Sequence, residues 1–415
     1  MKKYFRLHPY VKVIDGIKEC ALYNLFKGEV FSISKDEYRM LNDCENSIPL
    51  DEIENIDYKF ISDLKDNGLG LDYETKMFVN KNIYGLPQVV NDVFKRVFLN
   101  KLFIEITNEC NFNCEFCKND NILFRKTGCK KWPSYNEKLS IEEWSEIISE
   151  AKNLGCKNFV IMGGEPFLKF KKLKEIVSLI IHFNNNDDIK IIVFTNGFLL
   201  DDEKILNYIK HNNITLCIQI LADNDLTYEK ISGNACVFSK VVFPTDKLKK
   251  TAVKYDLVIL VSKFNENQIE NIFKKFKDSN KKLEFIYPIK NKFYSEKYIN
   301  LIYNRTKNFI KPSLPSFDRF SKYNNCYKNS IAISCDGLMY PCIMSRKLYL
   351  GNIRKVKLCE ALIKSEDLGY SALCKDKIEG CKLCHKRYGC FDCRALEMSA
   401  TNNLLGMEFC NLLHE

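Results

Sequence analysis

The sequence contains no long apolar run, no low-complexity tract and no internal repeat. Its longest apolar stretches, such as Ile176–Ile181, are far shorter than the roughly 18–20 residues that span a bilayer. Lys2, Lys3 and Arg6 lie near the N-terminus, but no apolar segment follows them, so the pattern of a signal peptide is missing. We therefore expect a cytoplasmic protein that does not cross a membrane.

A strong excess of charge on one face is also missing. The formal net charge is +10, but the lysines are scattered along the chain, which favours a solvated basic surface over nucleic-acid binding. Residues 1–85 contain 12 Lys and Arg against 15 Asp and Glu, a net charge of −3. This asymmetry indicates that residues 1–85 form a separate unit. We do not expect a nucleic-acid partner.

Cysteine is abundant, with 19 residues in 415. A reducing compartment disfavours disulfides, and this number of thiols is therefore hard to explain as cross-links in a cytoplasmic protein. Ligation of metal ions or iron–sulfur clusters is the natural alternative.

Residues 1–87 are predicted to form a winged-helix-like α+β module. Ser34 and Glu37 make a capping box at the start of one helix, and Tyr58–Lys65 is predicted to form a second helix. The Gly85-Leu86-Pro87 segment is a candidate linker to the rest of the chain. Three short strands are predicted before the helices, at Tyr10–Ile14, Cys20–Leu25 and Glu29–Ile33.

Residues 95–290 alternate between strands and amphipathic helices, which is typical of an α/β protein. Six such units predict a parallel sheet, either doubly wound or curled into a partial (β/α)6 barrel, with the chemistry at the carboxyl ends of the strands. A bridging segment, 291–325, then leads to a cysteine-rich domain, 326–415. The six strands are predicted at Phe98–Ile106, Asn158–Met162, Ile189–Phe194, Ile214–Ile220, Leu257–Val261 and Leu283–Tyr287.

The first cysteine group follows directly on the first strand of this sheet. Cys110, Cys114 and Cys117 form a CxxxCxxC pattern in a short loop. Three thiolates can hold three irons of a [4Fe–4S] cluster and leave the fourth iron open for a small molecule. A zinc site is the alternative, but zinc would normally recruit a fourth Cys or His, and no further one lies between Asn111 and Asn121.

This pattern resembles the radical S-adenosylmethionine (SAM) superfamily, and two further segments agree with the resemblance. Gly163-Gly164-Glu165-Pro166 closes the second strand as the GGEP segment of that superfamily does, and Thr195-Asn196-Gly197 closes the third. The resemblance implies that SAM chelates the open iron, that Glu165 holds its amine and that Phe116 packs near its adenine. Gln219, at the end of the fourth strand, stands where relatives often have a serine that contacts SAM.

The second cysteine group resembles the SPASM extension of the same superfamily, with one residue fewer before the sixth cysteine. The context Asp336-Gly337 followed by Pro341-Cys342 agrees with it. The resemblance implies two auxiliary [4Fe–4S] clusters, a distal one on Cys381, Cys384, Cys390 and Cys410 and another on Cys326, Cys342 and Cys393. A pair of zinc knuckles is the alternative. Among the other cysteines, Cys129 lies in the long insert after the first group, where a substrate could pass.

The N-terminal module resembles the PqqD-like peptide-recognition domain by topology, size and position. Such a domain binds a leader peptide as an added strand at an open sheet edge. Together the resemblances imply a peptide maturase that cleaves SAM reductively, abstracts hydrogen from a ribosomally made precursor peptide and installs a thioether or C–C crosslink. They also imply an electron donor such as a flavodoxin or ferredoxin. The alternatives are a sulfatase-type formylglycine maturase, a peptide epimerase, or a noncatalytic zinc- or peptide-binding protein.

Overall fold

The computed structural model describes residues 2–81, 97–124, 126, 128–183, 188–235, 237–286, 293–298, 311–390 and 393–410. The predicted Gly85-Leu86-Pro87 linker, Cys236 and part of the predicted bridging segment 291–325 lie outside the described residues.

Residues 2–81 form an α+β unit with two small antiparallel sheets. In one sheet β1 pairs with β5, and in the other the strand order is β2-β3-β4. Phe5, Leu22 and Leu41 are among the buried side chains of its core. In chain order, the elements are β1 (Tyr4–Leu7), β2 (Val11–Ile14), β3 (Cys20–Asn24), β4 (Glu29–Ile33), α1 (Lys35–Glu45), the 3-10 helix η1 (Leu50–Glu52), α2 (Tyr58–Asp66) and β5 (Gly70–Tyr73).

The three predicted strands and two predicted helices of this unit are confirmed. The capping box is present, since Ser34 Oγ accepts a hydrogen bond from Glu37 N at 3.2 Å and the Glu37 carboxylate accepts one from Ser34 N at 2.6 Å. The pair β1 and β5 was not predicted. Each strand has four residues, too few for a recognisable period, and they come together only because the chain folds back on itself.

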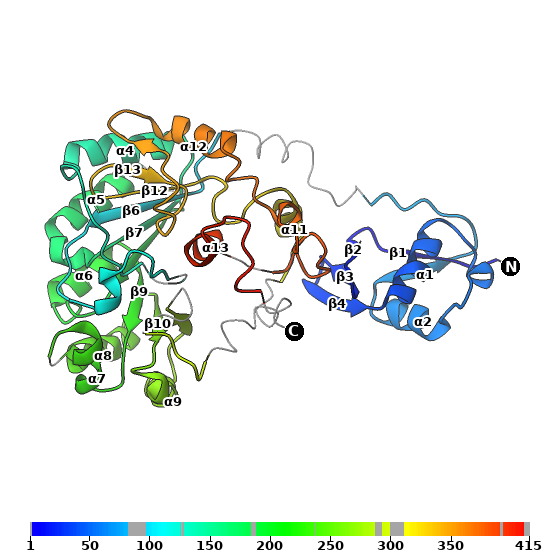
Figure 1. Cartoon of the computed structure of the whole chain (residues 1–415), viewed down its shortest axis with the longest axis horizontal. Coiled ribbons are helices and arrows are strands. Elements are labelled where there is room, and N and C mark those ends of the chain that lie inside the picture. The colour runs from blue at the N-terminus through cyan, green and yellow to red at the C-terminus, as the bar shows by residue number, and fades with distance from the viewer. Residues whose placement is uncertain are drawn as a thin grey trace.

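The middle of the chain forms a parallel sheet of six strands with helices between them, the predicted partial barrel. The strand order from β6 to β11 follows the chain, and Figure 1 shows α4, α5 and α6 on the outside of the sheet. Its strands are β6 (Lys101–Thr107), β7 (Asn158–Gly163), β8 (Lys190–Thr195), β9 (Thr215–Ile220), β10 (Tyr255–Val261) and β11 (Lys281–Phe285). Its helices are η2 (Glu115–Lys118), α4 (Ile141–Asn153), η3 (Pro166–Lys169), α5 (Phe170–Phe183), α6 (Glu203–His211), α7 (Asp225–Ser232), α8 (Val237–Lys249), η4 (Glu266–Gln268) and α9 (Ile269–Lys275).

The start of the predicted cysteine-rich domain extends the barrel sheet, an addition that the sequence did not predict. β12 pairs in parallel with β6, and β13 and β14 follow in antiparallel pairs to complete nine strands. Ile331, Ile333 and Met339 are fully buried in the barrel core. The elements are α11 (Leu314–Lys322), β12 (Ser330–Ile333), β13 (Leu338–Tyr340), β14 (Gly351–Asn352), α12 (Leu358–Asp367), η6 (Lys375–Lys377) and α13 (Arg394–Thr401).

The N-terminal unit packs on the C-terminal segment through the loop 383–388. The Tyr23 hydroxyl donates to His385 O at 2.9 Å, and Arg387 Nη1 donates to Asp15 O at 2.9 Å. Gly16 leaves room for this approach, because a Cβ there would lie 2.6 Å from His385 N. Figure 1 shows β3 and β4 facing α11 and the C-terminal segment, with the barrel on the far side.

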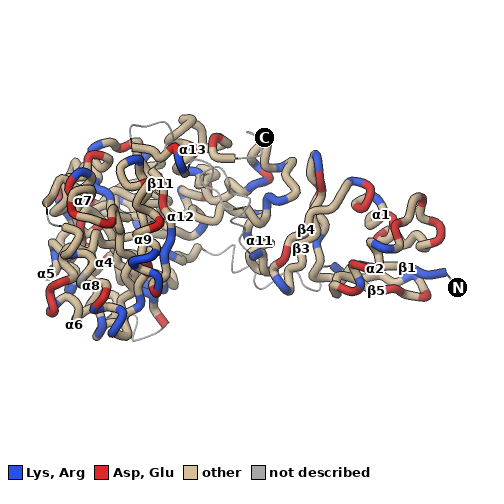
Figure 2. Tube along the Cα trace, turned by 90° about the horizontal axis from the view of Figure 1, so that it is seen from below, with Lys and Arg blue, Asp and Glu red and all other residues tan. Residues whose placement is uncertain are grey.

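Among the described residues, no helix has both the length and the apolar character needed to cross a bilayer. In the view of Figure 2, Lys and Arg lie among Asp and Glu over the barrel helices, and acidic residues are frequent around α1 and α2.

Candidate functional site: three groups of cysteines

Cys110, Cys114 and Cys117 lie in one loop after β6, called the cysteine loop from here on. Cys114 precedes η2 and Cys117 lies within it, where the Cys117 N–H donates to Cys114 O at 3.0 Å. The thiol of Cys114 hydrogen-bonds to that of Cys117, which raises the pKa of Cys114 and lowers that of Cys117. Burial raises the pKa of Cys110 to about 12. The structure therefore brings the three predicted cysteines together at the carboxyl end of the first barrel strand.

The loop between α7 and α8 anchors the cysteine loop. Asn113 N donates to Ser232 O at 2.7 Å, and Asn234 Nδ2 donates to Asn111 O at 2.6 Å. Phe112 is buried and meets the Phe198 ring edge-on. These contacts position the cysteine loop from several directions, so its conformation does not depend on the thiols alone.

The two glycines of the GGEP segment allow β7 to approach the cysteine loop. Gly164 N donates to Thr107 O at 2.9 Å, and Glu165 N donates to Glu109 O at 2.8 Å. A Cβ on Gly163 would lie 2.2 Å from Thr107 O, and one on Gly164 would lie 2.1 Å from Glu109 O. Any larger residue would separate these backbones, which explains in physical terms why both positions are glycine.

Glu165 connects the ends of β7 and β8. Its buried carboxylate accepts hydrogen bonds from Thr195 Oγ1 at 2.9 and 3.0 Å, from Asn196 N at 2.8 Å and from Phe167 N at 3.1 Å. Desolvation by burial raises its pKa to about 7. Pro166 begins η3 directly after it. Glu165 therefore has a structural role, joining two strand ends, that the motif alone did not reveal.

Asn196 joins the end of β8 to the cysteine loop. Its Nδ2 donates to Asn111 Oδ1 at 2.8 Å and lies 3.7 Å from Cys110 Sγ. The three loop cysteines, Gly164, Asn196 and Gln219 line one small pocket at the ends of the parallel strands. The structure thus gathers the residues of four strand ends that the sequence assigned to one site.

Cys129 lines the same pocket, although its position in the insert gave little reason to expect this. Cys129 forms an isolated parallel bridge with Gly163, which holds the insert against the end of β7. The cysteine is 19 residues beyond Cys110 and belongs to no spacing pattern, so only the fold could reveal its place.

Phe116 lies in an aromatic cluster beside this pocket. Its ring meets those of Phe124 and Phe293 edge-on, at centroid distances of 5.5 and 6.4 Å. A cavity of about 160 Å³ is lined by Phe116, Phe264, Phe293 and the side chains of Lys230 and Ser262, among others. Flat apolar walls with a few polar groups suit a planar heterocycle.

The second group of cysteines gathers around Tyr327. The Tyr327 hydroxyl hydrogen-bonds with Ser345 Oγ at 2.8 Å. Burial raises the pKa of Tyr327 well above its ordinary value, and negative charge on Cys342, Cys393 and Cys326 adds to this effect. These are the three cysteines that the sequence assigned to the second auxiliary cluster.

The third group lies nearer to the N-terminal unit. Burial raises the pKa of the Cys384 thiol, with charge on Cys390 and Cys410 adding to the rise and Lys375 opposing it. Lys375 Nζ lies 4.0 Å from Cys381 Sγ and 3.9 Å from Cys390 Sγ. Of the four cysteines predicted for the distal cluster, Cys381 and Cys390 therefore lie beside this lysine, and Cys384 lies close enough to Cys390 and Cys410 to sense their charge. No group of three or more His, Cys, Asp and Glu in the described ranges is placed to hold a single metal ion.

A larger cavity, of about 250 Å³, lies between the insert and the C-terminal segment. Trp132 and Tyr340 form part of its wall, and the Arg346 guanidinium lies 4.9 Å from the centroid of each ring. Arg346 also pairs with Glu105 of β6. Burial raises the pKa of Glu105, and the guanidinium of Arg346 opposes this rise. No motif marked these residues, because they meet from segments more than 200 positions apart.

Residues 104–276 match the family model described as the Radical SAM superfamily, so the barrel is a radical SAM domain. The GTP 3′,8-cyclase of Staphylococcus epidermidis is 28% identical over 205 residues, which cover 48% of this chain and 57% of the cyclase. This chain therefore spans little more than half of the length of that curated relative.

A longer match is the cysteine-type anaerobic sulfatase-maturating enzyme of Clostridium perfringens, 24% identical over 71% of this chain and 90% of the enzyme. Among solved structures, anSMEcpe with bound AdoMet has a TM-score of 0.55 at 21% identity and covers 76% of this chain and 94% of its own. SuiB of Streptococcus suis, bound to the precursor peptide SuiA, has a TM-score of 0.54 at 14% identity and covers 95% and 94%.

Proposed function

We propose that this protein is a radical SAM enzyme that modifies a ribosomally made precursor peptide. The observation that carries the first half of the proposal is the pocket in which the cysteine loop, Gly164, Asn196 and Gln219 meet. Cys110, Cys114 and Cys117 would hold a [4Fe–4S] cluster there. When bound, the cluster and SAM supply reductive cleavage and hydrogen abstraction.

The residues of the pocket suit such a cluster. Three soft thiols converge, and charge on Lys130 and Lys131 lowers the pKa of Cys117, in addition to the hydrogen bond from Cys114. Asn111 Nδ2 is buried with no hydrogen-bond partner among the described residues, so it is an N–H donor available to sulfur. Lys130 itself is almost fully buried beside the Trp132 ring. Buried cations and free N–H donors are what an anionic cluster requires.

The binding of SAM is assigned to residues that surround this cluster site. Glu165 would accept a hydrogen bond from the amine of SAM, in addition to its protein donors. The aromatic cavity beside Phe116 would receive the adenine. Gly163 and Gly164 have no side chain to separate β7 from the cysteine loop, and Pro166 begins η3 directly after Glu165. Gln219 offers an amide at the end of β9.

The two C-terminal groups would hold auxiliary [4Fe–4S] clusters. Cys381, Cys384, Cys390 and Cys410 provide four thiols for the distal cluster, and Cys326, Cys342 and Cys393 provide three for the other. The cavity at Trp132 and Tyr340 lies beside the second group, since its wall also contains Tyr327 and residues that follow Cys393 in α13. We assign this cavity to the peptide segment that is modified.

The N-terminal unit supports a peptide substrate. Among the described strands, β4 pairs only with β3, so its second edge is available for an added strand. Phe31 on β4 is 38% exposed and offers an apolar contact beside that edge. The alignment with SuiB covers nearly the whole chain, and SuiB is bound to a precursor peptide in its structure. We therefore assign leader-peptide binding to β4.

The sulfatase-maturase alternative is favoured by the long match to the Clostridium perfringens enzyme. The two functions differ in what they demand of residues 2–81. A maturase that recognises a short motif at the active site has no need of β4, whereas a leader-dependent enzyme loses its substrate when that edge is damaged.

The experiment compares the wild-type protein with Phe31→Asp on a candidate precursor peptide, chosen from any short open reading frame next to its gene. Burial of a Phe is worth roughly 1.5–3 kcal/mol, so we expect a loss of peptide affinity of tenfold or more with unchanged SAM cleavage in the absence of peptide. Leu368→Asp, a 48% exposed position at the end of α12, is the matched control. Equal turnover of the precursor by both variants would favour the maturase, and absence of iron would favour a zinc- or peptide-binding protein.

A further inference from the structure

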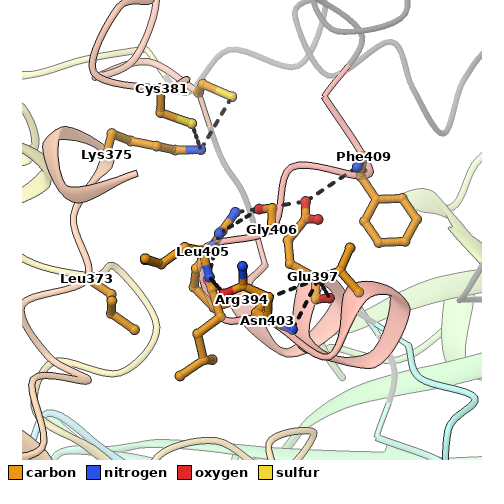
Figure 3. Close-up of polar contacts among 12 residues, drawn as sticks. Leu373, Lys375, Cys381, Arg394, Glu397, Asn403, Leu405, Gly406 and Phe409 are labelled. Atoms are coloured by element: carbon orange, nitrogen blue, oxygen red, sulfur yellow. Dashed lines mark hydrogen bonds and ion pairs between the residues drawn. The ribbon is translucent and has the colours of Figure 1, made fainter. Parts of the chain in front are cut away.

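Lys375 is a buried lysine beside two cysteines of the third group. It begins η6, directly after Cys374, and only 8% of the residue is exposed. Figure 3 shows its ammonium pointing toward two sulfur atoms, which belong to Cys381 and Cys390 and lie 4.0 and 3.9 Å from Nζ.

Burial of an ammonium group is costly unless negative charge compensates it. Neutral thiols are weak acceptors and provide little compensation, whereas thiolates bound to iron carry the required charge. The contact of Lys375 with two of the four cysteines is therefore the arrangement expected when the group is ligated. It places one positive charge within the immediate surroundings of the cluster.

We propose that Lys375 sets the reduction potential of the distal auxiliary cluster by donating N–H···S hydrogen bonds to Cys381 and Cys390. This inference rests on the proposed function, which assigns the cluster to these cysteines. A [4Fe–4S] cluster with four thiolates gains one negative charge when one electron reduces it. A nearby cation and its hydrogen bonds stabilise the more negative state, so they raise the potential.

A second network holds the segment that carries Cys410 independently of Lys375. Arg394 Nη1 donates to Leu404 O at 2.8 Å and to Gly406 O at 2.9 Å, and the Glu397 carboxylate accepts from Phe409 N at 3.4 Å. Figure 3 shows this network on α13, apart from the lysine. The segment that carries Cys410 is therefore held by its own contacts. For this reason we expect the cluster to remain when Lys375 is replaced.

The test is a potentiometric titration of the full-length chain, followed by electron paramagnetic resonance, with redox mediators as the electron source. The background carries alanine at all three positions of the cysteine loop, which removes the catalytic signal. Cys384→Ala in this background identifies the distal signal by its loss. The compared variants are Lys375→Met, Lys375→Gln and Lys375→Arg, with Lys377→Met as the matched control, because Lys377 lies two residues on and is exposed.

We expect Lys375→Met to shift the one-electron equilibrium of the distal cluster toward the oxidised form by tenfold or more, about 59 mV per decade. Lys375→Gln should show a smaller shift, and Lys375→Arg and Lys377→Met almost none. If Lys375→Met and Lys375→Gln lose the distal cluster but Lys375→Arg keeps it, the cation is needed for assembly, which also supports the contact.

Full iron content with an unchanged potential in Lys375→Met would overturn the inference and leave the proposed function intact. Loss of the cluster in all three variants would also overturn it, because arginine keeps the charge and the donors. If the background protein contained no distal signal at all, the assignment of the auxiliary clusters itself would be wrong.

Discussion

Glu165 offers the sharpest test of the SAM site, because its surroundings predict both an affinity and a pH dependence. Replacement by alanine would remove the charge-assisted hydrogen bond that we propose to the SAM amine, worth roughly 1.5–3 kcal/mol, so we expect a loss of about one to two decades in affinity. The same change removes the acceptor of Thr195 Oγ1, Asn196 N and Phe167 N. Each buried donor left unsatisfied costs about 1–3 kcal/mol, so the melting temperature should fall as well.

The pH dependence follows from burial, which raises the pKa of Glu165 to about 7 from an ordinary 4.5. In the proposed contact the carboxylate form binds the ammonium of SAM, so affinity should fall about tenfold per pH unit below 7 and level off above it. The contribution of Glu165 to the free energy of unfolding changes with pH in the opposite direction. An acid whose pKa rises on folding contributes stability below pH 4.5 that is lost as the pH rises through about 7.

The assay is equilibrium binding of SAM to the iron-loaded protein between pH 6 and 8.5, with iron content and melting temperature recorded for each variant. Glu165→Ala and Glu165→Gln should bind weakly and without pH dependence, while their iron content stays near that of the wild type. Glu203→Ala, which removes an exposed carboxylate on α6, is the control. Unchanged SAM affinity in Glu165→Ala, or a persistent slope in either variant, would refute the assigned contact.

Two further predictions concern the cysteine loop and the contact between the units. Replacement of all three loop cysteines by alanine should leave about two-thirds of the iron and abolish SAM cleavage. Cys156→Ala, which removes an unrelated buried thiol, should change neither the iron content nor the cleavage. Deoxyadenosine formation by the triple variant would contradict the assignment. Gly16→Ala should weaken the contact of the N-terminal unit with the loop 383–388, because the new Cβ would lie 2.6 Å from His385 N. The radius of gyration from X-ray scattering should therefore increase. Lys18→Ala, at an exposed position, should leave it unchanged. Equal radii for both variants would show that the contact tolerates a methyl group.

Local signals predicted much of this structure. The capping box at Ser34 is present as expected, and the predicted strand Asn158–Met162 begins at the same residue in the structure. The cysteine loop, the GGEP segment and Thr195–Asn196 each follow a buried strand, so the meeting of these segments at one sheet edge could be predicted from topology alone.

The remaining features depend on contacts between distant segments, which no local pattern records. Glu165 was assigned to SAM, but its bonds to Thr195 and Asn196 show that it also holds two strands together. Cys129 reaches the pocket only because the insert bridges to Gly163. The addition of β12 beside β6 was not predicted either, since four residues of a cysteine-rich segment show no period that identifies a partner strand.

The contact between Tyr23 and His385 joins residues 362 positions apart, and this has a consequence for the order of biosynthesis. The ribosome releases β3 and β4 long before the loop 383–388 exists, and domains generally fold as they emerge. The face of the N-terminal unit around Ala21, Tyr23 and Leu25 is therefore exposed throughout synthesis of the barrel. Because Cys384 lies within the loop that covers this face, insertion of iron at the proposed distal cluster would belong to the same late stage of maturation as closure of the chain onto itself.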